Sequence, residues 1–395
     1  MPGFMMKLYI VPSWYPSRLN PINGTFFAEW AQMLADSGID VTVITNLMHP
    51  FKAWPGFRQL PPRVKKAQLE HGLRTYRREA INPFPRLESL TFRYYRRRLI
   101  RQFEIVLEEQ GIPDALLIHS SLWAGAALSE WMQSTSIPCI IVEHMKAFLL
   151  DRGFTPFQMG AIRRAYQGAD KVVAVSTALE TRIKQLFPGI RDKTTVIHNP
   201  LAIAESTMNR SLSKDTPFTF ISVAYLRPEK RIDILLRAFA ELRGGGHETT
   251  LRLVGDGPLR SPLEKLAREV GIQDSVIFLG NLDRQAMKEE LLRSHCLVLS
   301  SEVETFGLAL VEALACGLPV ISTRCGGPQD IVTEEAGILV PVNDPAALGH
   351  AMAGMIENAS TYNPARLNEY AHRYFSPQVY VSRLNTLFSD LAPSS

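Results

Sequence analysis

The sequence lacks several features that would place it in a specialised class of protein. Its four cysteines form no Cys-x-x-Cys pair, which argues against a zinc site or a disulfide framework and favours a reduced, cytosolic protein. The longest apolar runs, such as residues 138–142 and 296–299, fall far short of the ~20 residues that cross a bilayer. Only residues 8–11 form an apolar run near the start, so no signal peptide is expected.

A large charge of one sign is absent from the total but not from every segment. The chain has 43 Lys and Arg against 39 Asp and Glu, a net charge of +4, which argues against a strongly basic nucleic-acid-binding protein. Residues 51–101 alone carry 14 basic and three acidic side chains, and the remainder carries 29 basic and 36 acidic ones. The protein is therefore mildly acidic apart from one basic segment, residues 51–101.

This basic segment includes a stretch with helical periodicity. Residues 90–101 place Phe92, Tyr95, Leu99 and Ile100 between basic side chains, a pattern typical of an amphipathic helix. Two interpretations stay open. The segment either docks on an anionic membrane, since each basic residue near such a surface contributes about 1 kcal/mol, or forms a solvated helix face.

Short apolar runs alternate with amphipathic stretches along most of the 395 residues, and this length suggests two domains. Strands that are apolar throughout and separated by helices indicate parallel sheets covered on both faces. A first helix is expected over residues 25–37. The strands expected in the first half are residues 7–12, 41–45, 115–119, 138–143, 171–175 and 194–198. Those expected in the second half are residues 218–224, 249–255, 276–279, 296–300, 319–323 and 337–340.

A polar stretch without periodicity, residues 201–217, separates the two series and is interpreted as a linker. The sequence therefore predicts an α/β protein with two Rossmann-like, doubly wound domains, residues 1–200 and 218–375. A last helix, residues 376–392, opens with Ser-Pro, which are an N-cap and a first-turn residue.

The most specific motif lies between the strand ending near residue 300 and the next helix, expected over residues 308–316. Its sequence is Glu-Thr-Phe-Gly-Leu-Ala-Leu-Val-Glu, residues 304–312. Glu304 and Glu312 should flank the helix N-terminus, which is an anion site. A carboxylate repels phosphate but accepts hydrogen bonds from a sugar diol, so the pattern indicates a nucleotide-sugar. On its own, this spacing is explained more simply by a helix cap and a solvated glutamate.

Two glycine-containing loops also follow strands of the second half, at the edge where ligands bind in such sheets. Gly255 and Gly257 lie in Val-Gly-Asp-Gly-Pro and permit either the close approach of a ligand or a tight turn. Residues 279–281, Leu-Gly-Asn, suit backbone contacts with a flat base.

A third loop of the second half is basic. Arg227, Lys230 and Arg231 follow the strand expected over residues 218–224. They either supply positive charge where a diphosphate would need it or form a solvated basic turn. The loop alone does not decide between these two interpretations.

Together, these stretches resemble a known family. Residues 302–332, with Val-Gly-Asp-Gly-Pro and Leu-Arg-Pro-Glu-Lys, are similar to GT-B glycosyltransferases, specifically the retaining family 4, also called glycosyl transferases group 1. The similarity covers nearly the whole chain and is most specific from Glu304 to Asp330. It implies two Rossmann-like domains facing across a cleft, with the C-terminal helix crossing back to the N-terminal domain.

The resemblance also implies roles for the matching residues. Glu312 would bind the ribose of the donor, Glu304 would bind hydroxyls of the transferred sugar, and Lys230 would neutralise the diphosphate. The backbone at residues 306–308 would hold the sugar and the diphosphate. The donor-binding residues expected are Gly24, Arg227, Lys230, Gly255, Gly257, Leu279, Asn281, Glu304, Thr305, Phe306, Gly307, Leu308 and Glu312.

One position departs from the family pattern. The family often has Gly-Arg-Leu where this chain has Ala-Tyr-Leu at residues 224–226, so Tyr225 replaces the usual phosphate-binding arginine. The hypothesis is that Arg227, two residues away, takes over that role.

The first half contributes a loop and a helix start. Gly24 precedes the helix expected over residues 25–37, and matches the family's glycine-containing loop beside the diphosphate; a loop glycine needed only for its backbone angle is the alternative. Trp14 and Tyr15 follow the first strand and are candidates for the acceptor side.

Two histidines end strands of the first half. His144 follows the strand 138–143 and can hydrogen-bond a sugar hydroxyl or phosphate; a structural role is the alternative, but the family has a functional histidine here. His119 is a weaker candidate on the acceptor side or behind His144, and Glu143 is placed to orient either histidine.

The implied reaction moves a hexosyl unit, with retention, from a nucleoside-diphosphate sugar to an acceptor hydroxyl, with His144, Glu304 and Lys230 as catalytic candidates. No cofactor or metal is expected, because no Asp-x-Asp cluster ends a strand. The expected partners are the donor, a saccharide or lipid-linked acceptor and an anionic membrane surface at residues 51–101. The expected location is the cytoplasm or the inner face of its membrane. Alternatives are a GT-B sugar-nucleotide epimerase or phosphorylase, and a non-catalytic nucleotide-sugar-binding subunit.

Overall fold

The computed structural model describes residues 6–21, 23–58, 67–70, 72–150, 153–201 and 216–391. The chain forms two compact units. The first comprises residues 1–175, 180–197 and 380–395, and the second comprises residues 176–179 and 198–379. Most of the linker expected over residues 201–217 lies outside the described residues.

The first unit is built on an eight-stranded sheet in the order β3-β4-β2-β1-β5-β6-β7-β8. All neighbouring strands are parallel except β3 and β4, which are antiparallel. The strands are β1 (Lys7–Pro12), β2 (Asp40–His49), β3 (Gln68–Glu70), β4 (Leu73–Ile81), β5 (Ala115–His119), β6 (Cys139–Glu143), β7 (Lys171–Ala174) and β8 (Thr194–Val196). All six expected strands are confirmed, with ends that differ by a few residues.

The second unit has a six-stranded sheet in the order β11-β10-β9-β12-β13-β14, in which all neighbours are parallel. The strands are β9 (Phe218–Val223), β10 (Thr249–Val254), β11 (Val276–Gly280), β12 (Cys296–Leu299), β13 (Val320–Thr323) and β14 (Gly337–Val340). The order reverses direction at β9 and β12, so the loops after these two strands lie at the switch point where ligands bind in such sheets.

Helices connect the parallel strands. The helices up to β8 are α1 (Thr25–Asp36), α2 (Trp54–Phe57), α3 (Glu88–Gln110), α4 (Ala126–Ser134), α5 (Pro156–Gly168) and α6 (Thr177–Leu186). Those after β9 are α7 (Ile232–Gly244), α8 (Arg260–Glu269), α9 (Arg284–Arg293), α10 (Leu308–Ala315), α11 (Pro345–Asn358), α12 (Pro364–Phe375) and α13 (Pro377–Leu391). Within the described ranges, no helix is both long enough and apolar enough to cross a membrane.

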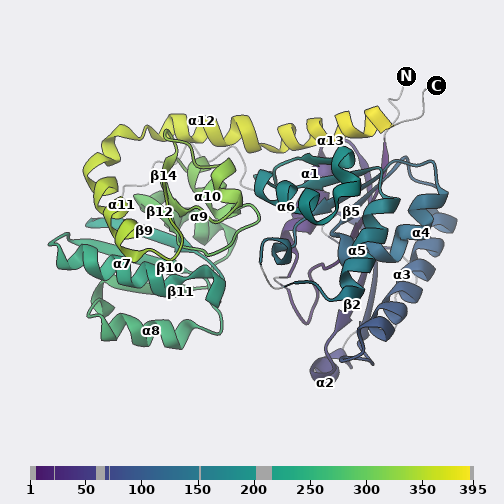
Figure 1. The fold of residues 1–395 in the computed structure, drawn as a ribbon, viewed down its shortest axis with the longest axis horizontal. Helices are drawn as coiled ribbons and strands as arrows, with labels where there is room; N and C mark the ends of the chain where they lie inside the picture. Colours follow the sequence, from purple (N-terminus) through teal and green to yellow (C-terminus); the bar gives the residue numbers. More distant parts are fainter. Residues whose placement is uncertain are drawn as a thin grey trace. The chain divides into compact units, whose positions relative to one another are not determined.

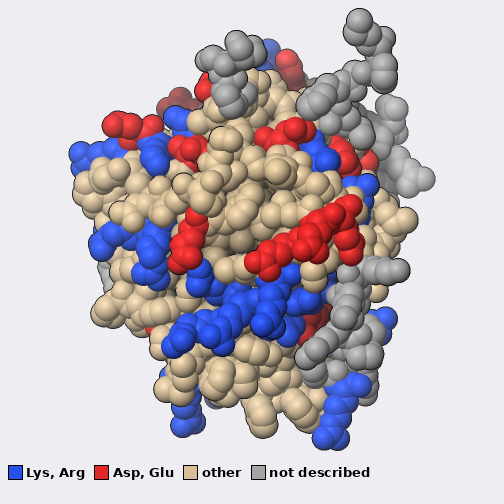
Figure 2. Space-filling model, turned by 90° about the vertical axis from the view of Figure 1, so that its right-hand side faces the viewer, with Lys and Arg blue, Asp and Glu red and all other residues tan. Residues whose placement is uncertain are grey.

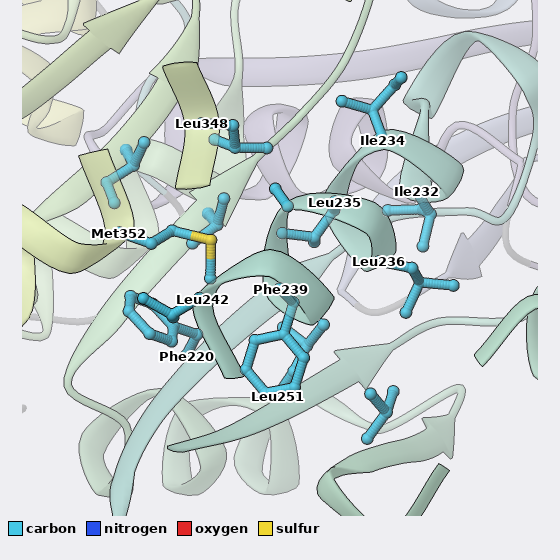
Figure 3. Close-up of a cluster of buried hydrophobic side chains, with 14 of the residues drawn as sticks. Phe220, Ile232, Ile234, Leu235, Leu236, Phe239, Leu242, Leu251, Leu348 and Met352 are labelled. Carbon is cyan, nitrogen blue, oxygen red and sulfur yellow. The ribbon is translucent and has the colours of Figure 1, made fainter. Parts of the chain in front are cut away.

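Helix packing in the second unit follows from apolar stripes at helical spacing. On α7, Leu235, Leu236 and Phe239 are fully buried, and α7 packs against α11 and α8 while α10 packs against α12 (Figure 1). Figure 3 shows the side chains of α7 lying beside Phe220 of β9 and Leu251 of β10. This core holds the sheet whose loops carry the Glu304 motif.

The pair β3 and β4 is the main element that the sequence analysis did not predict. β4 lies beside β2 in parallel register from Arg74 opposite Thr42 to Ile81 opposite His49. β4 has no continuous apolar run in its sequence, Leu-Arg-Thr-Tyr-Arg-Arg-Glu-Ala-Ile. Several of its side chains are charged and partly exposed. The basic segment is therefore partly a strand at one side of the sheet.

The last helix belongs mainly to the first unit. From Tyr380 onward the chain is part of that unit, and the buried rings of Tyr380 and Trp30 lie 6.4 Å apart between centroids. The helix begins at Pro377, and the Val379 N–H donates to the Ser376 hydroxyl over 3.4 Å. The expected start of this helix is confirmed.

Candidate functional site

The sequence-predicted residues fall into two sets, one in each unit. In the second unit, the loop from β12 to α10 is held against the loop after β13. The Glu304 N–H donates to the Cys325 carbonyl and the Gly327 N–H donates to the Glu304 carbonyl, both over 2.9 Å. A Cβ at Gly327 would lie 2.3 Å from the Cα of Phe306, so only glycine allows this approach.

The start of α10 has the predicted position. The helix begins at Leu308, and Gly307 is its N-cap with a φ of 109°, a conformation that favours glycine. The loop containing Glu304 therefore enters the helix through a turn that other residues adopt only with strain. The predicted helix is confirmed, although it ends at Ala315 rather than at residue 316.

Lys230 and Glu304 form an ion pair. Nζ of Lys230 lies 2.5 Å from Oε1 of Glu304, and the Ser301 hydroxyl donates to the same oxygen over 2.7 Å. The Ser300 hydroxyl donates to the Lys230 carbonyl over 2.9 Å, which joins the loop after β9 to the loop after β12. The structure thus brings together two residues that lie 74 positions apart. Ser301 was missed, although its place two residues after the buried strand β12 could have identified it.

Glu312 lies on α10 with a side chain that is 12% exposed. Nη1 of Arg284 is 3.9 Å from its carboxylate, and Arg284 is the first residue of α9, which follows residues 279–281 at the end of β11. Arg284 was not predicted as a site residue. Its contact places the loop expected to receive the base close to the carboxylate expected to receive the ribose.

The glycines of Val-Gly-Asp-Gly-Pro pack against neighbouring backbone. A Cβ at Gly255 would lie 2.0 Å from the Ala224 oxygen, and one at Gly257 would lie 2.6 Å from the Leu226 oxygen. The Gly255 N–H also donates to the Gly280 carbonyl over 2.7 Å. These glycines therefore allow the loops after β9, β10 and β11 to lie side by side, so at least part of their role is packing.

Tyr225, which replaces the family's usual arginine, supports Arg227. The guanidinium of Arg227 lies 4.5 Å from the centroid of the Tyr225 ring, and both side chains are exposed. A cation over an aromatic face is held by the ring quadrupole. Whether Arg227 contacts a donor remains a prediction.

The ring of Phe306, within the Glu304 motif, is fully enclosed. It stacks on His198 at 5.6 Å and meets Phe375 at 5.8 Å between centroids. Nε2 of His198 lies 3.2 Å from Oδ2 of Asp330, which also accepts from the Thr177 N–H over 2.6 Å. Burial raises the pKa of Asp330, but these hydrogen bonds outweigh it and leave the pKa below the usual value. Asp330 ends the most specific part of the motif, but the sequence alone gave no sign of this role.

In the first unit, the structure brings His119 and His144 together. Nδ1 of His119 lies 3.0 Å from Nε2 of His144. The rings of Phe27 and Trp30, both on α1, lie within 4.5–6.0 Å of the two imidazole centroids. Burial lowers the pKa of His119 to about 3, and burial together with the neighbouring His119 holds the pKa of His144 well below 6.5. Both rings are therefore neutral at pH 7.

Glu143 does not orient a histidine ring in the way the sequence analysis expected. Its buried carboxylate accepts from the N–H groups of His144 and Met145 over 3.0 and 3.1 Å. The other oxygen accepts from the Ser121 N–H and hydroxyl and from the Tyr166 hydroxyl. A buried carboxylate needs donors on both oxygens. Because two of these donors are backbone N–H groups, Glu143 fixes the backbone at His144.

Tyr15 is buried, although it was expected on the acceptor side. It is 4% exposed, its ring lies 5.5 Å from the Arg77 guanidinium, and burial raises its pKa to about 12. Trp14 is partly exposed and packs on Phe27 at 5.5 Å.

Gly24 precedes α1 with a φ of 79°, and a Cβ there would lie 3.0 Å from the Trp14 oxygen. The glycine thus serves packing and conformation together.

The basic segment is partly neutralised. Arg74 pairs with Asp40, Arg77 with Glu70 and Glu79, and Arg96 with Glu130.

The predicted helix is part of α3, but its apolar residues Phe92, Tyr95 and Leu99 are buried. Exposed basic residues of α3 are Arg93, Arg97 and Arg101, and exposed acidic residues farther along are Glu104, Glu108 and Glu109. Figure 2, which shows the side where α3 lies in Figure 1, has a band of Lys and Arg beside acidic side chains. Arg63, Lys65 and Lys66 lie outside the described residues.

Comparison with known proteins places these features in a family. Residues 24–205 match the model of Glycosyltransferase Family 4, and residues 204–374 match the model of Glycosyl transferases group 1. The N-acetyl-alpha-D-glucosaminyl L-malate synthase of Bacillus anthracis is 29% identical over 249 residues, which are 60% of this chain and 64% of that protein. The D-inositol 3-phosphate glycosyltransferase of Acidothermus cellulolyticus is 27% identical over 361 residues, 84% of this chain and 77% of that one.

Solved structures show the same fold. Sucrose-phosphate synthase from Thermosynechococcus elongatus has a TM-score of 0.75 at 19% identity and covers 98% of this chain and 99% of its own. HepE of Anabaena in complex with UDP-glucose has a TM-score of 0.69 at 18% identity, with 97% and 100% coverage. The chain has two α/β units with mostly parallel sheets, the Glu304 motif and matches to both family models. It therefore belongs to the family 4, group 1 glycosyltransferases with the GT-B fold.

Proposed function

We propose that this protein is a retaining hexosyltransferase that uses a nucleoside-diphosphate sugar and transfers the hexosyl unit to an acceptor hydroxyl. The observation that carries the proposal is the contact between Lys230 and Glu304, with Glu312 on the helix that follows. One cation and two carboxylates at a helix start match the parts of a nucleotide-sugar: diphosphate, hexose hydroxyls and ribose hydroxyls. HepE, which shares the fold, binds UDP-glucose.

The ion pair accounts for the charges of the proposed donor site. Lys230 and Glu304 neutralise one another, and Ser301 supports the carboxylate. When a donor binds, the ammonium group turns to the diphosphate and the carboxylate accepts hydrogen bonds from the hexose. The exchange gives each charged group a partner before and after binding, so neither is left buried and unpaired.

The proposed reaction breaks the bond between the anomeric carbon and the diphosphate oxygen and forms one to the acceptor oxygen. Negative charge develops on the departing diphosphate, so stabilising it is the main catalytic task. Lys230, Arg227 and the N-terminus of α10 carry out this task without a resident metal ion. The acceptor hydroxyl passes its proton to the leaving diphosphate on the same face of the sugar, which retains the configuration. His144 contacts the sugar or its phosphate as a neutral hydrogen-bonding group.

The proposed acceptor is a lipid-linked saccharide at an anionic membrane surface. The support is the exposed row of Arg93, Arg97 and Arg101 at intervals of four residues on α3, which lie on one helical face. Leu87 and Leu90 are 55% and 36% exposed near the start of the same helix. Because the main apolar face of α3 is buried, the attraction is largely electrostatic. Liposomes with anionic lipid should bind the protein at low salt, and binding should weaken as salt rises; no binding at low salt would refute this part.

A turnover assay tests the main proposal. The protein is incubated with UDP-, GDP- and ADP-glucose and a panel of saccharide acceptors, and both the nucleoside diphosphate and the glycosylated product are measured. Formation of both in equal amounts is the expected result. An epimerised donor without transfer would instead identify a sugar-nucleotide epimerase, and donor binding without any product would identify a non-catalytic subunit.

A further inference from the structure

The hydrogen bond between His119 and His144 has a consequence for the chemistry of His144. His119 is the last residue of β5, and His144 directly follows β6, the neighbouring strand. Nδ1 of His119 lies 3.0 Å from Nε2 of His144. A hydrogen bond between two neutral imidazole nitrogens requires that one nitrogen carries the proton and the other accepts it. The pair therefore couples the tautomer of one ring to that of the other.

The surrounding side chains restrict both rings. Phe27 lies against His119 with centroids 4.5 Å apart and an interplanar angle of 32°, and Trp30 lies against His144 at 5.4 Å and 33°. His119 is 1% exposed, whereas His144 keeps partial exposure. Burial keeps both rings neutral at pH 7. The two facing nitrogens therefore share a single proton, and neither ring becomes a cation.

The backbone of His144 is fixed independently of its ring. Glu143 accepts from the N–H groups of His144 and Met145, which sets the turn after β6. Rotation of the imidazole and the choice of tautomer are the freedoms that remain; the bond to His119 opposes rotation and ties the tautomer of His144 to that of His119.

We propose that His119 is a positioning residue for His144: it occupies Nε2 of His144 and thereby makes Nδ1 the nitrogen that meets the donor. The proposal deepens the proposed function and rests on it in one respect, the contact between His144 and the donor. A role for His119 in packing alone would make a different prediction, because packing depends on the ring and positioning depends on the nitrogen.

Two substitutions separate these roles. His119→Phe keeps an aromatic ring against Phe27 but removes the hydrogen-bonding nitrogen. His119→Asn loses the ring but keeps a polar group near the position of Nδ1, able to donate or accept. Positioning predicts that the asparagine variant resembles the wild type more than the phenylalanine variant does. Packing predicts the reverse order.

The experiment measures kcat and KM for the donor and records nitrogen NMR spectra of the histidine rings. His119→Phe should lower kcat/KM about 10- to 100-fold, and His119→Asn should stay within about threefold of the wild type, since a buried imidazole nitrogen without a partner is costly. The Nε2 resonance of His144 should show a hydrogen-bonded nitrogen in the wild type and in His119→Asn, and a nitrogen without that partner in His119→Phe.

Phe103→Leu is the matched control. It truncates a buried ring of the same unit that contacts Tyr9 and Trp131 rather than the histidines. It should lower the melting temperature without altering the His144 spectrum. If His119→Phe does not fold, His119→Leu replaces it, because leucine also lacks the nitrogen.

An unchanged His144 spectrum in His119→Phe, or higher activity in His119→Phe than in His119→Asn, would overturn the proposal. If the wild type transfers no sugar from any donor, the proposed function fails. The spectra then still decide whether His119 occupies Nε2 of His144.

Discussion

The two candidate regions hold their functional groups by different physical means. In the second unit, Lys230 and Glu304 are charged, partly exposed and paired with one another. In the first unit, His119 and His144 are neutral, enclosed by aromatic rings and joined by one hydrogen bond. Charged groups suit a ligand that carries charge, and neutral imidazoles suit hydroxyl or phosphate oxygens that need direction rather than charge. The difference predicts that substitutions in the two regions will affect different kinetic steps.

Removing the cation of the second unit should have the largest effect. Lys230→Ala should lower kcat about 100- to 1000-fold, because charge on the departing diphosphate then loses its main partner. Steady-state kinetics with a working donor provides the measurement. Lys265→Ala, at a side chain that is 73% exposed and paired with Glu269, is the control and should stay within about twofold. An equal loss of kcat in both variants would contradict a catalytic role for the Lys230–Glu304 pair.

The close approach of Gly327 to Phe306 should be the next most sensitive feature. Gly327→Ala places a Cβ 2.3 Å from the Phe306 Cα, so the Glu304 loop must shift, at a cost of about 1–3 kcal/mol in the free energy of unfolding. Gly354→Ala, on α11 with no atom within 4 Å of the added Cβ, should instead stabilise by about 0.5–1 kcal/mol. Thermal unfolding of both variants checks the pair. A neutral Gly327→Ala would show that the loop has room to move.

The Asp330 carboxylate should give a smaller, pH-dependent effect. Its pKa is lower in the folded than in the unfolded chain, so its contribution to stability is present above the unfolded value, about 3.9, and is lost as the pH falls through the folded value. Asp330→Asn should therefore be less stable than the wild type at pH 7, and the gap should narrow below about pH 4. Unfolding curves at several pH values provide the test. A gap that stays constant down to pH 3 contradicts the assigned cause.

Removal of divalent metal ions should have the smallest effect. Because protein cations and a helix N-terminus are proposed to stabilise the diphosphate, dialysis against EDTA should leave kcat and KM unchanged. Activity is measured before and after dialysis, and again after addition of Mg²⁺ or Mn²⁺. Loss on dialysis with recovery on addition would show that the charge-neutralising role belongs in part to a metal ion.

Much of the fold followed from sequence because most strands are apolar throughout. Runs such as residues 115–119 and 296–299 are buried on both faces, and this pattern has few alternatives. β4 escaped prediction because charged residues such as Arg77 and Glu79 interrupt it, and their ion pairs are visible only in three dimensions. The predicted strand ends differ from the observed ones by a few residues. Parallel pairing, rather than composition, decides where a strand stops.

The site was predictable where its residues are contiguous and not where they meet across the fold. The motif at residues 304–312 combines two carboxylates and a helix start within nine residues. The bond between His119 and His144 spans 25 positions, and the support of Phe306 by His198 spans more than 100. Tyr15 was misplaced because a tyrosine in a loop looks exposed in sequence, whereas Arg77 from β4 covers its ring.

Donor binding to the second unit tests the central claim most directly. Melting temperatures of the wild type, Lys230→Ala and Glu312→Gln are measured with UDP-, GDP- and ADP-glucose. A donor at a hundredfold excess over its Kd stabilises the folded chain by about 2.7 kcal/mol, so at least one should raise the melting temperature of the wild type by several degrees and that of each variant by much less. No shift with any of the three, or equal shifts in wild type and variants, would contradict a nucleotide-sugar site built on Lys230, Glu304 and Glu312.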